Sequence, residues 1–212
     1  SARDRNKAWD LELVAKLGTK AMGLMQYDAI GLGGGDFLLG TDFLRKIASD
    51  AGIRFVTTNL MYRDGKQPFG DRYAIVKAGD IKVGVLAVLP LSAFDDISDK
   101  KLIEGLEIMM PETAIEAVLP EVKRKADIVV LLSQYDLEKT RLLIKGLDGI
   151  DLSICCGDMD SGGGCAGKEA GTESQETLIK ASYQGAQLGY ARLNLDTSGK
   201  AAIIRSNMIP LD

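Results

Sequence analysis

Histidine is absent from all 212 residues of the sequence. Imidazole is the side chain that titrates near neutral pH, and it is both the commonest general base and the commonest zinc ligand in proteins. This stretch of chain therefore lacks the usual base for acid–base catalysis and the usual ligand for a zinc centre.

Cysteine is scarce, with three residues at Cys155, Cys156 and Cys165. No C-x-x-C spacing occurs, which excludes the common redox and zinc-ribbon motifs, and no C-x-x-C-H haem site is present. Three thiolates in one loop suit a soft metal in principle, but their spacing matches no metal motif. We expect Cys155 to end a buried strand, whereas Cys156 and Cys165 either form a disulfide in an oxidising compartment or remain thiols.

Long apolar runs and a basic surface are also missing. The longest apolar run, Val83 to Leu89, is far too short to span a membrane. Lys and Arg total 26 against 30 Asp and Glu, a net charge of −4. The densest basic cluster, Lys123 to Lys125, is flanked by Glu121 and Asp127, so it predicts a solvated helix end rather than a nucleic-acid site. No signal peptide is visible.

The residues that are present predict a single α/β domain covering 1–212, as a fragment of a longer chain. Helices and strands alternate early, and antiparallel strands gather late. The expected helices are 8–26, 41–52, 111–125 and 138–147, and the expected strands are 29–32, 54–58, 73–78, 81–89, 128–132, 152–155, 177–181, 190–195 and 201–205. The apolar face of the first helix, which includes Leu13, Leu17 and Leu24, is expected to be buried. The link Gly79-Asp80 between two of these strands predicts a hairpin. The apolar runs 83–89 and 128–132 are expected to be central strands of the two sheets. The polar segment Ser92 to Gly105 predicts a surface connection.

The stretch from Tyr27 to Gly40, YDAIGLGGGDFLLG, predicts the site. A short strand runs directly into Gly33, Gly34 and Gly35 and then Asp36, and ligands of open α/β sheets bind at the carboxyl ends of strands. One interpretation is anion binding by backbone N–H groups. The spacing is not that of a P-loop, because no Lys or Ser follows Gly35. The favoured interpretation is that the glycines replaced bulky ligands and left a shallow pocket.

Oxygen-bearing side chains form a second candidate site: Asp36, Gln134, Asp158 and Asp160, with Asn59 following the strand 54–58. Such ligands suit Ca²⁺, Mg²⁺ or Mn²⁺, and two carboxylates also suit an acid–base pair. However, Asp158 and Asp160 lie in a glycine-rich loop, where aspartate is an ordinary turn residue. We therefore expect no dedicated metal ligands and no cofactor.

The order of these segments resembles the calcineurin-like metallophosphoesterase superfamily, and in particular its 5′-nucleotidase-like branch. The resemblance rests on YDAIGLGGGDFLLG, on TTNL around Asn59, on VVLLSQYDLEK from Val129, on IDLSICCGDM from Ile150 and on ETLIKASYQGAQLGYARLNLD from Glu176. It implies a four-layer sandwich of two mixed sheets flanked by helices, with the first strand missing from this chain.

The same resemblance implies degenerate metal-binding motifs. The family's bridging asparagine and catalytic histidine correspond to Gly34 and Gly35, and its next ligand histidine corresponds to Gln134. Its final histidine pair corresponds to Gly157 and Met159, so that only the acidic Asp36 and Asp158 remain. The vestigial pocket is expected to contain Gly34, Gly35, Asp36, Asn59, Gln134, Gly157, Asp158 and Met159.

Two functional classes follow. One is a catalytically inactive domain with a binding or assembly role, beside an unknown protein partner or a neighbouring domain. The other is a metal-dependent phosphoesterase or nucleotidase completed by residues outside this chain. The resemblance also implies a periplasmic or extracytoplasmic location.

Overall fold

The computed structural model describes residues 2–65, 67–155, 178–180, 187–195 and 201–210. The α-helices are α1 (Ala2–Leu24), α2 (Thr41–Ala51), α3 (Pro111–Lys125) and α4 (Leu137–Lys145), with 3₁₀ turns η1 (Gly34–Leu39) and η2 (Lys100–Ile103). The strands are β1 (Ile30–Gly31), β2 (Phe55–Val56), β3 (Leu60–Tyr62), β4 (Ala74–Ala78), β5 (Ile81–Val88), β6 (Leu106–Ile108), β7 (Ile128–Ser133), β8 (Leu152–Cys155), β9 (Leu178–Lys180), β10 (Gln187–Leu195) and β11 (Ala201–Pro210).

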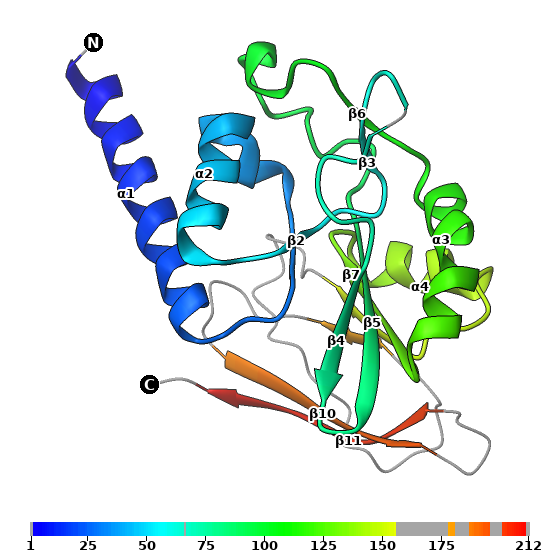
Figure 1. Ribbon diagram of the computed structural model, residues 1–212. Helices are drawn as coiled ribbons and strands as arrows, with labels where there is room; N and C mark the ends of the chain where they lie inside the picture. The colour runs from blue at the N-terminus through cyan, green and yellow to red at the C-terminus, as the bar shows by residue number, and fades with distance from the viewer. Residues whose placement is uncertain (1, 66, 156–177, 181–186, 196–200, 211–212) are drawn as a thin grey trace.

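The elements stack in four layers, as expected for an α/β sandwich. Helices α1 and α2 lie on one side of the sheets and α3 and α4 on the other (Figure 1). Between them lie the parallel pair β1–β2 and a five-stranded sheet in the order β4-β5-β7-β8-β9. In the larger sheet only β4 is antiparallel to its neighbour, so among the described strands this sheet is mixed and the smaller one is parallel.

The five-stranded sheet is centred on two strands with long apolar runs. The hairpin β4–β5 turns at Gly79-Asp80, as the sequence predicts, and pairs Ala78 with Ile81. We expected the runs at 83–89 and 128–132 to be central strands of two different sheets. This was wrong: β5 and β7 are parallel neighbours in one sheet, in which Val83 pairs with Ile128. Long apolar runs indicate burial on both faces but not which strand is the neighbour.

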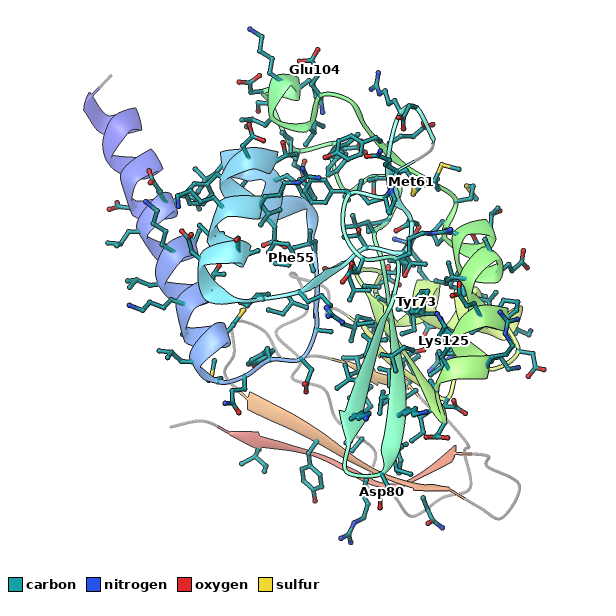
Figure 2. All side chains as sticks on the ribbon, viewed as in Figure 1. Phe55, Met61, Tyr73, Asp80, Glu104 and Lys125 are labelled. Atoms are coloured by element: carbon teal, nitrogen blue, oxygen red, sulfur yellow. The ribbon has the colours of Figure 1, made fainter. Side chains whose placement is uncertain are left out.

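Helices α3 and α4 cover the outer face of this sheet. Their buried side chains pack with Leu86, Val88, Val129 and Leu131 of β5 and β7; those of α3 are Ile115, Val118, Leu119 and Val122, and that of α4 is Leu143. A polar contact adds to this packing, because the Tyr73 hydroxyl bonds Glu121 at 2.7 Å and accepts from Lys125 Nζ at 2.7 Å. Figure 2 shows Tyr73 and Lys125 side by side between the sheet and α3.

The pair β1–β2 packs against the other face of the large sheet. Val56 of β2 is fully buried with Ala74, Val85 and Ala87. At Gly31 the two sheets approach closely, because a Cβ there would lie 3.1 Å from the Cβ of Ala87 and 3.3 Å from that of Leu132. Glycine at this position therefore allows the two sheets to pack directly on each other.

The first helix differs from the expectation. It begins earlier, and its apolar face is exposed: Leu13 is 53% exposed, Leu17 58% and Leu24 77%. The opposite face meets α2 through small residues, since a Cβ on Gly23 would lie 2.4 Å from the Ala51 carbonyl oxygen. Periodicity correctly indicated a helix, but the described residues place nothing over its apolar side. Among the described helices, none has the length and apolarity required to cross a membrane.

Helix α4 supplies a test of pH dependence. Asp136 caps the helix by accepting a hydrogen bond from the Lys139 N–H at 2.8 Å, and this bond, with the Lys139 side chain, lowers the pKa of the Asp136 carboxyl. A lowered pKa means that the unfolded state binds more protons, so the stabilisation is present above the ordinary pKa near 3.8 and is lost as the pH falls through the folded value.

We predict that Asp136→Ala lowers the free energy of unfolding by about 1 kcal/mol at pH 7, with a smaller loss at pH 3. Asp136→Asn is the matched control, because its amide oxygen accepts the same bond at every pH. Urea denaturation of both variants at the two pH values measures this. An Asp136→Ala deficit that is unchanged between pH 7 and pH 3 would contradict the assignment.

Candidate functional site

The carboxyl ends of β1, β2, β5 and β7 meet at one edge of the sandwich and bring the predicted residues together. The glycine-rich loop follows β1, Asn59 follows β2, residues 90–97 follow β5 and Gln134 follows β7. The side-chain amide of Gln134 lies beside the loop, since a Cβ on Gly33 would be 3.3 Å from Gln134 Oε1 and 3.8 Å from Asp36 Oδ2. Asp36 and Gln134 thus border the same small region.

The carboxylate of Asp36 is engaged by its own loop. Its Oδ2 accepts a hydrogen bond of 2.7 Å from the Gly33 N–H and so caps the 3₁₀ turn η1. Asp36 also borders an apolar cavity of about 270 Å³ lined by residues of α1, β1, η1 and α2. Desolvation beside this cavity raises the pKa of the Asp36 carboxyl, and the Gly33 hydrogen bond opposes the shift. The carboxylate therefore acts first as a turn-stabilising group.

Gly34 is packed against the protein's own backbone. A Cβ at this position would lie 1.9 Å from the carbonyl oxygen of Ala93 and 2.9 Å from its carbonyl carbon. No side chain fits here unless the 90–97 segment moves, because an atom at 1.9 Å overlaps the oxygen. At Gly35, by contrast, a Cβ would meet nothing within 4 Å. Gly34 and Gly35, the two positions that the sequence resemblance aligns with ligand residues, are thus in different environments.

The segment Ser92 to Gly105 lies largely on the surface, as expected, but its first part also packs into the protein. Ile97 is only 2% exposed, and the Phe94 ring packs edge-on against Phe37 with centroids 5.1 Å apart. Burial raises the pKa of the Tyr135 hydroxyl, and the nearby Leu91 backbone opposes this shift. The apolar residues Ala93, Phe94 and Ile97 are the feature of the sequence that indicates this packing. They are interspersed with polar residues, which are typical of an exposed connection.

Asn59 has a structural role in this arrangement. The residue is fully buried, its Nδ2 donates to the Leu89 carbonyl at 2.9 Å and the Met109 carbonyl at 3.0 Å, and its Oδ1 accepts from the Leu89 N–H at 2.9 Å. Both ends of the amide are occupied by backbone partners. Asn59 thus joins β5 to the segment before α3 and points no available oxygen at a ligand.

The remaining predicted residues lie outside the described residues: Gly157, Asp158 and Met159 of the pocket, and the candidate disulfide partners Cys156 and Cys165. Cys155 is buried at the end of β8, as expected. Within the part of the chain that the structure describes, no three acidic or cysteine side chains gather as a metal site would require. Of the predicted oxygen-bearing side chains, Asp36 and Gln134 lie near each other, and Asp160 lies outside the described residues.

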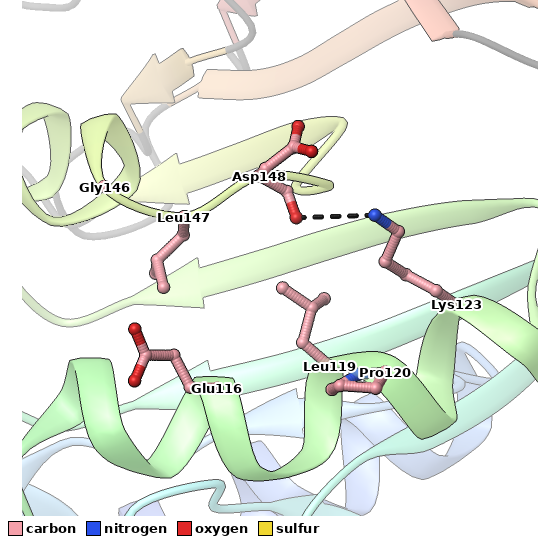
Figure 3. Close-up of a pocket in the computed structure, with 7 residues that line it drawn as sticks. All are labelled: Glu116, Leu119, Pro120, Lys123, Gly146, Leu147 and Asp148. Carbon is pink, nitrogen blue, oxygen red and sulfur yellow. Dashed lines mark hydrogen bonds between the residues drawn. The ribbon is translucent and has the colours of Figure 1, made fainter.

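A second depression lies on the opposite side of the large sheet. It is lined by α3 and by the connection from α4 to β8, including Glu116, Pro120, Lys123 and Asp148 (Figure 3). The only hydrogen bond drawn there runs from Lys123 Nζ to the Asp148 carbonyl oxygen at 3.5 Å. This depression contains none of the predicted site residues.

Comparison with solved structures identifies the fold. A calcineurin-like phosphoesterase, YfkN from Bacillus subtilis, superposes with a TM-score of 0.72 at 21% identity over 91% of this chain and 66% of its own. A 5′-nucleotidase precursor from Thermus thermophilus gives 0.73 at 18% identity over 92% of this chain and 41% of its own. NAD nucleotidase from Haemophilus influenzae gives 0.67 at 14% identity, with 92% and 42% coverage. No family model and no curated protein matches the sequence.

The chain therefore has the fold of the calcineurin-like metallophosphoesterases. Within that class, the structures that it resembles include several 5′-nucleotidases, in agreement with the resemblance of the sequence segments. It spans about two fifths of the length of the two nucleotidase chains and 66% of the YfkN chain.

The packing of Gly34 yields a prediction with an internal control. We expect Gly34→Asn to lower the free energy of unfolding by at least about 2 kcal/mol, because the 90–97 segment must be displaced. Gly35→Asn introduces the same side chain one residue later, where there is open space, and should cost about 0.5 kcal/mol or less. Thermal denaturation of the two variants is the measurement, and equal melting temperatures would refute the close approach of Ala93.

The buried hydrogen bonds of Asn59 yield a second prediction. Asn59→Ala removes three buried hydrogen bonds and leaves their backbone partners unsatisfied, which should cost about 3 kcal/mol or more. Ser92→Ala, at an exposed position in the next loop, should change stability by about 0.5 kcal/mol or less. If Asn59→Ala melted like the parent protein, the structural role assigned to the amide would be refuted.

Proposed function

We propose that this chain is a degenerate, catalytically inactive domain of the metallophosphoesterase fold, retained for binding or assembly. The observation that carries the proposal is the contact between Gly34 and Ala93. Where the family has a ligand side chain, the space belongs to the chain's own backbone, at a Cβ-to-oxygen distance of 1.9 Å. The loss of the ligand is thus accompanied by a repacked pocket, which a single reverting substitution does not undo.

The other pocket positions support the same proposal. Metal-assisted phosphoester cleavage requires ions that activate a water molecule and neutralise the phosphoryl oxygens. Asp36 is used as a turn cap, and Asn59 is saturated by backbone groups. Gly35, Gly157 and Met159 offer no hard ligand, and Gln134 offers one neutral oxygen. A general acid that protonates the leaving group typically raises the rate by about 10²–10⁴. This sequence has no histidine to supply that proton.

The alternative is a phosphoesterase completed by residues outside this chain. It draws support from the proximity of Asp36 and Gln134, which remain side by side at the carboxyl edge where a metal would be bound. The two functions differ in one measurable respect. Under the alternative, a longer polypeptide or a complex binds metal and turns over substrate. Under the favoured function, the longer polypeptide and the complex bind no metal and turn over no substrate.

The partner and location belong to the same proposal. We place the domain outside the cytoplasm, beside a neighbouring domain or a protein partner, without a bound cofactor and without a nucleic-acid ligand. Support comes from the neighbour named as a 5′-nucleotidase precursor, from the mildly acidic composition, and from the limited share of the longer solved chains that this chain covers.

The experiment combines metal analysis with an activity assay. We expect the polypeptide translated in full from its gene to retain less than stoichiometric divalent metal, by elemental analysis, after exposure to Mn²⁺ and gel filtration. We also expect no turnover of nucleoside monophosphates or aryl phosphates above the level of a mock purification. Asp158→Asn and Asp36→Asn controls identify contaminating phosphatase, because a contaminant is insensitive to both substitutions. Mn²⁺-dependent turnover that disappears in either variant would restore the enzyme hypothesis.

A further inference from the structure

The depression between α3 and the connection from α4 to β8 has two unlike ends. One wall is a face of α3 that carries Glu116, Leu119, Pro120 and Lys123, and the other wall is formed by residues 146–148 (Figure 3). Two turns of helix, or about 10 Å, separate Glu116 from Lys123. The volume is about 450 Å³, which is within the range of ordinary ligand pockets. The depression is therefore large enough to hold an elongated group whose two ends differ in polarity.

The end at Glu116 offers hydrogen-bond acceptors. Pro120 lies inside α3 and has no N–H, so the backbone carbonyl of Glu116 lacks the donor that an α-helix places four residues later. The Glu116 carboxylate is exposed and forms no ion pair with another described residue. Figure 3 shows it directed from α3 toward the wall that contains Leu147. Helix α4 ends at Lys145 beside this wall, and the last carbonyls of a helix carry partial negative charge. These groups favour a cation that has several N–H donors.

Between its two ends the depression has an apolar floor. Leu119 and Leu147 form this floor and are themselves nearly buried, and Pro120 lies beside them. A lysine ammonium is compact and strongly hydrated, whereas a guanidinium group is planar, weakly hydrated and carries five N–H donors in a fork. A divalent metal ion does not match the floor, because it needs several oxygen ligands in a compact shell. The combination of apolar floor and acceptors therefore selects a guanidinium group.

The end at Lys123 offers a hydrogen-bond donor in a fixed place. The lysine stem lies along Gly149, where a Cβ would be 2.8 Å from both Cδ and Cε of Lys123. Its Nζ donates to the Asp148 carbonyl at 3.5 Å, a long hydrogen bond, and this is its only one among the described residues. An ammonium group has three N–H donors, so two are available to a further acceptor. This end of the depression therefore suits a carbonyl oxygen of the bound group.

We propose that this depression binds an arginine residue of a protein partner. The guanidinium group lies at the Glu116 end, where the carboxylate and the backbone carbonyl of Glu116 accept its hydrogen bonds. The aliphatic stem packs on Leu119 and Leu147, and a backbone carbonyl of the partner accepts from Lys123 Nζ. The inference rests on the proposed binding role of the domain, which it deepens by naming the chemistry of the partner.

A polypeptide fits this surface better than free arginine does. Leu142 lies one helical turn before Gly146 on the same side of α4, and it is 70% exposed. This leucine lies next to the wall of the depression and offers an apolar contact to a residue that neighbours the arginine. Free arginine has no such residue, and its carboxylate would meet a single ammonium group that already donates to Asp148. An arginine with an apolar neighbour is also a common anchor of protein interfaces.

The experiment measures the binding of short capped peptides to the polypeptide translated in full from its gene. The probes are acetyl-Gly-Arg-Leu-amide and the same peptide with lysine or norleucine in place of arginine, and an NMR titration follows their binding. We expect the arginine peptide to bind with a Kd of about 1 mM or lower. The lysine peptide should bind at least about 5-fold more weakly and the norleucine peptide at least about 10-fold more weakly, because they supply fewer charge-assisted hydrogen bonds or none.

Three variants locate the binding site. Glu116→Gln removes the carboxylate charge and should weaken binding of the arginine peptide at least about 10-fold. Pro120→Ala restores an N–H to which the Glu116 carbonyl is then bonded, so it should weaken binding about 3-fold or more. It should not lower the melting temperature, because alanine favours the helix. Glu104→Gln, at an exposed glutamate before β6, is the matched control and should leave the affinity unchanged.

Three results would overturn the inference. One is equal binding of the three peptides, or no binding with a Kd below about 10 mM. Another is an affinity for the arginine peptide that Glu116→Gln lowers no more than Glu104→Gln does. The third is free arginine that binds at least about 10-fold more tightly than the capped peptide, as at a small-molecule site. The peptide titration is independent of the metal and turnover assays, so an inactive domain that binds no arginine peptide contradicts this inference alone.

Discussion

Buried hydrogen bonds from two consecutive residues hold the sandwich together at the edge where the site lies. The Thr58 N–H donates to the Ala87 carbonyl at 2.7 Å, and its hydroxyl accepts from the Ala87 N–H at 3.0 Å. Asn59 then bonds Leu89 and Met109. These contacts connect the segment after β2 to the end of β5 with almost no access to water. A shift of one sheet along the other would leave these buried polar groups without partners, at a cost in free energy. The hydrogen bonds of Thr58 and Asn59 therefore determine the register between the two sheets.

That register explains how the segment after β5 comes to lie against the glycine-rich loop. Once Leu89 is held by Asn59, the chain leaving β5 must cross the carboxyl edge of β1. It does so with Ala93 against Gly34 and with Phe94 against Phe37. Glycine is the only residue that admits such an approach without displacement of the backbone. The glycine at position 34 and the segment packed against it are therefore two aspects of one packing solution.

The position of α1 shows how far one sequence pattern can be interpreted. Its apolar residues recur with helical periodicity, and the segment is a helix. The same residues were expected to face a core, but in the described structure they face outward. Periodicity reports which residues share a face, whereas burial depends on what other chain segments reach that face.

The sequence by itself determined the four α-helices, most of the strands, the hairpin at Gly79-Asp80 and the absence of histidine, because these depend on local residue preferences or on composition. It also determined the family resemblance, through the order of short segments. Tertiary structure decided the rest. The adjacency of β5 and β7, the saturation of Asn59 and the approach of Ala93 to Gly34 all join residues about 30 to 60 positions apart. No local pattern encodes such contacts, since each depends on how the two sheets are stacked.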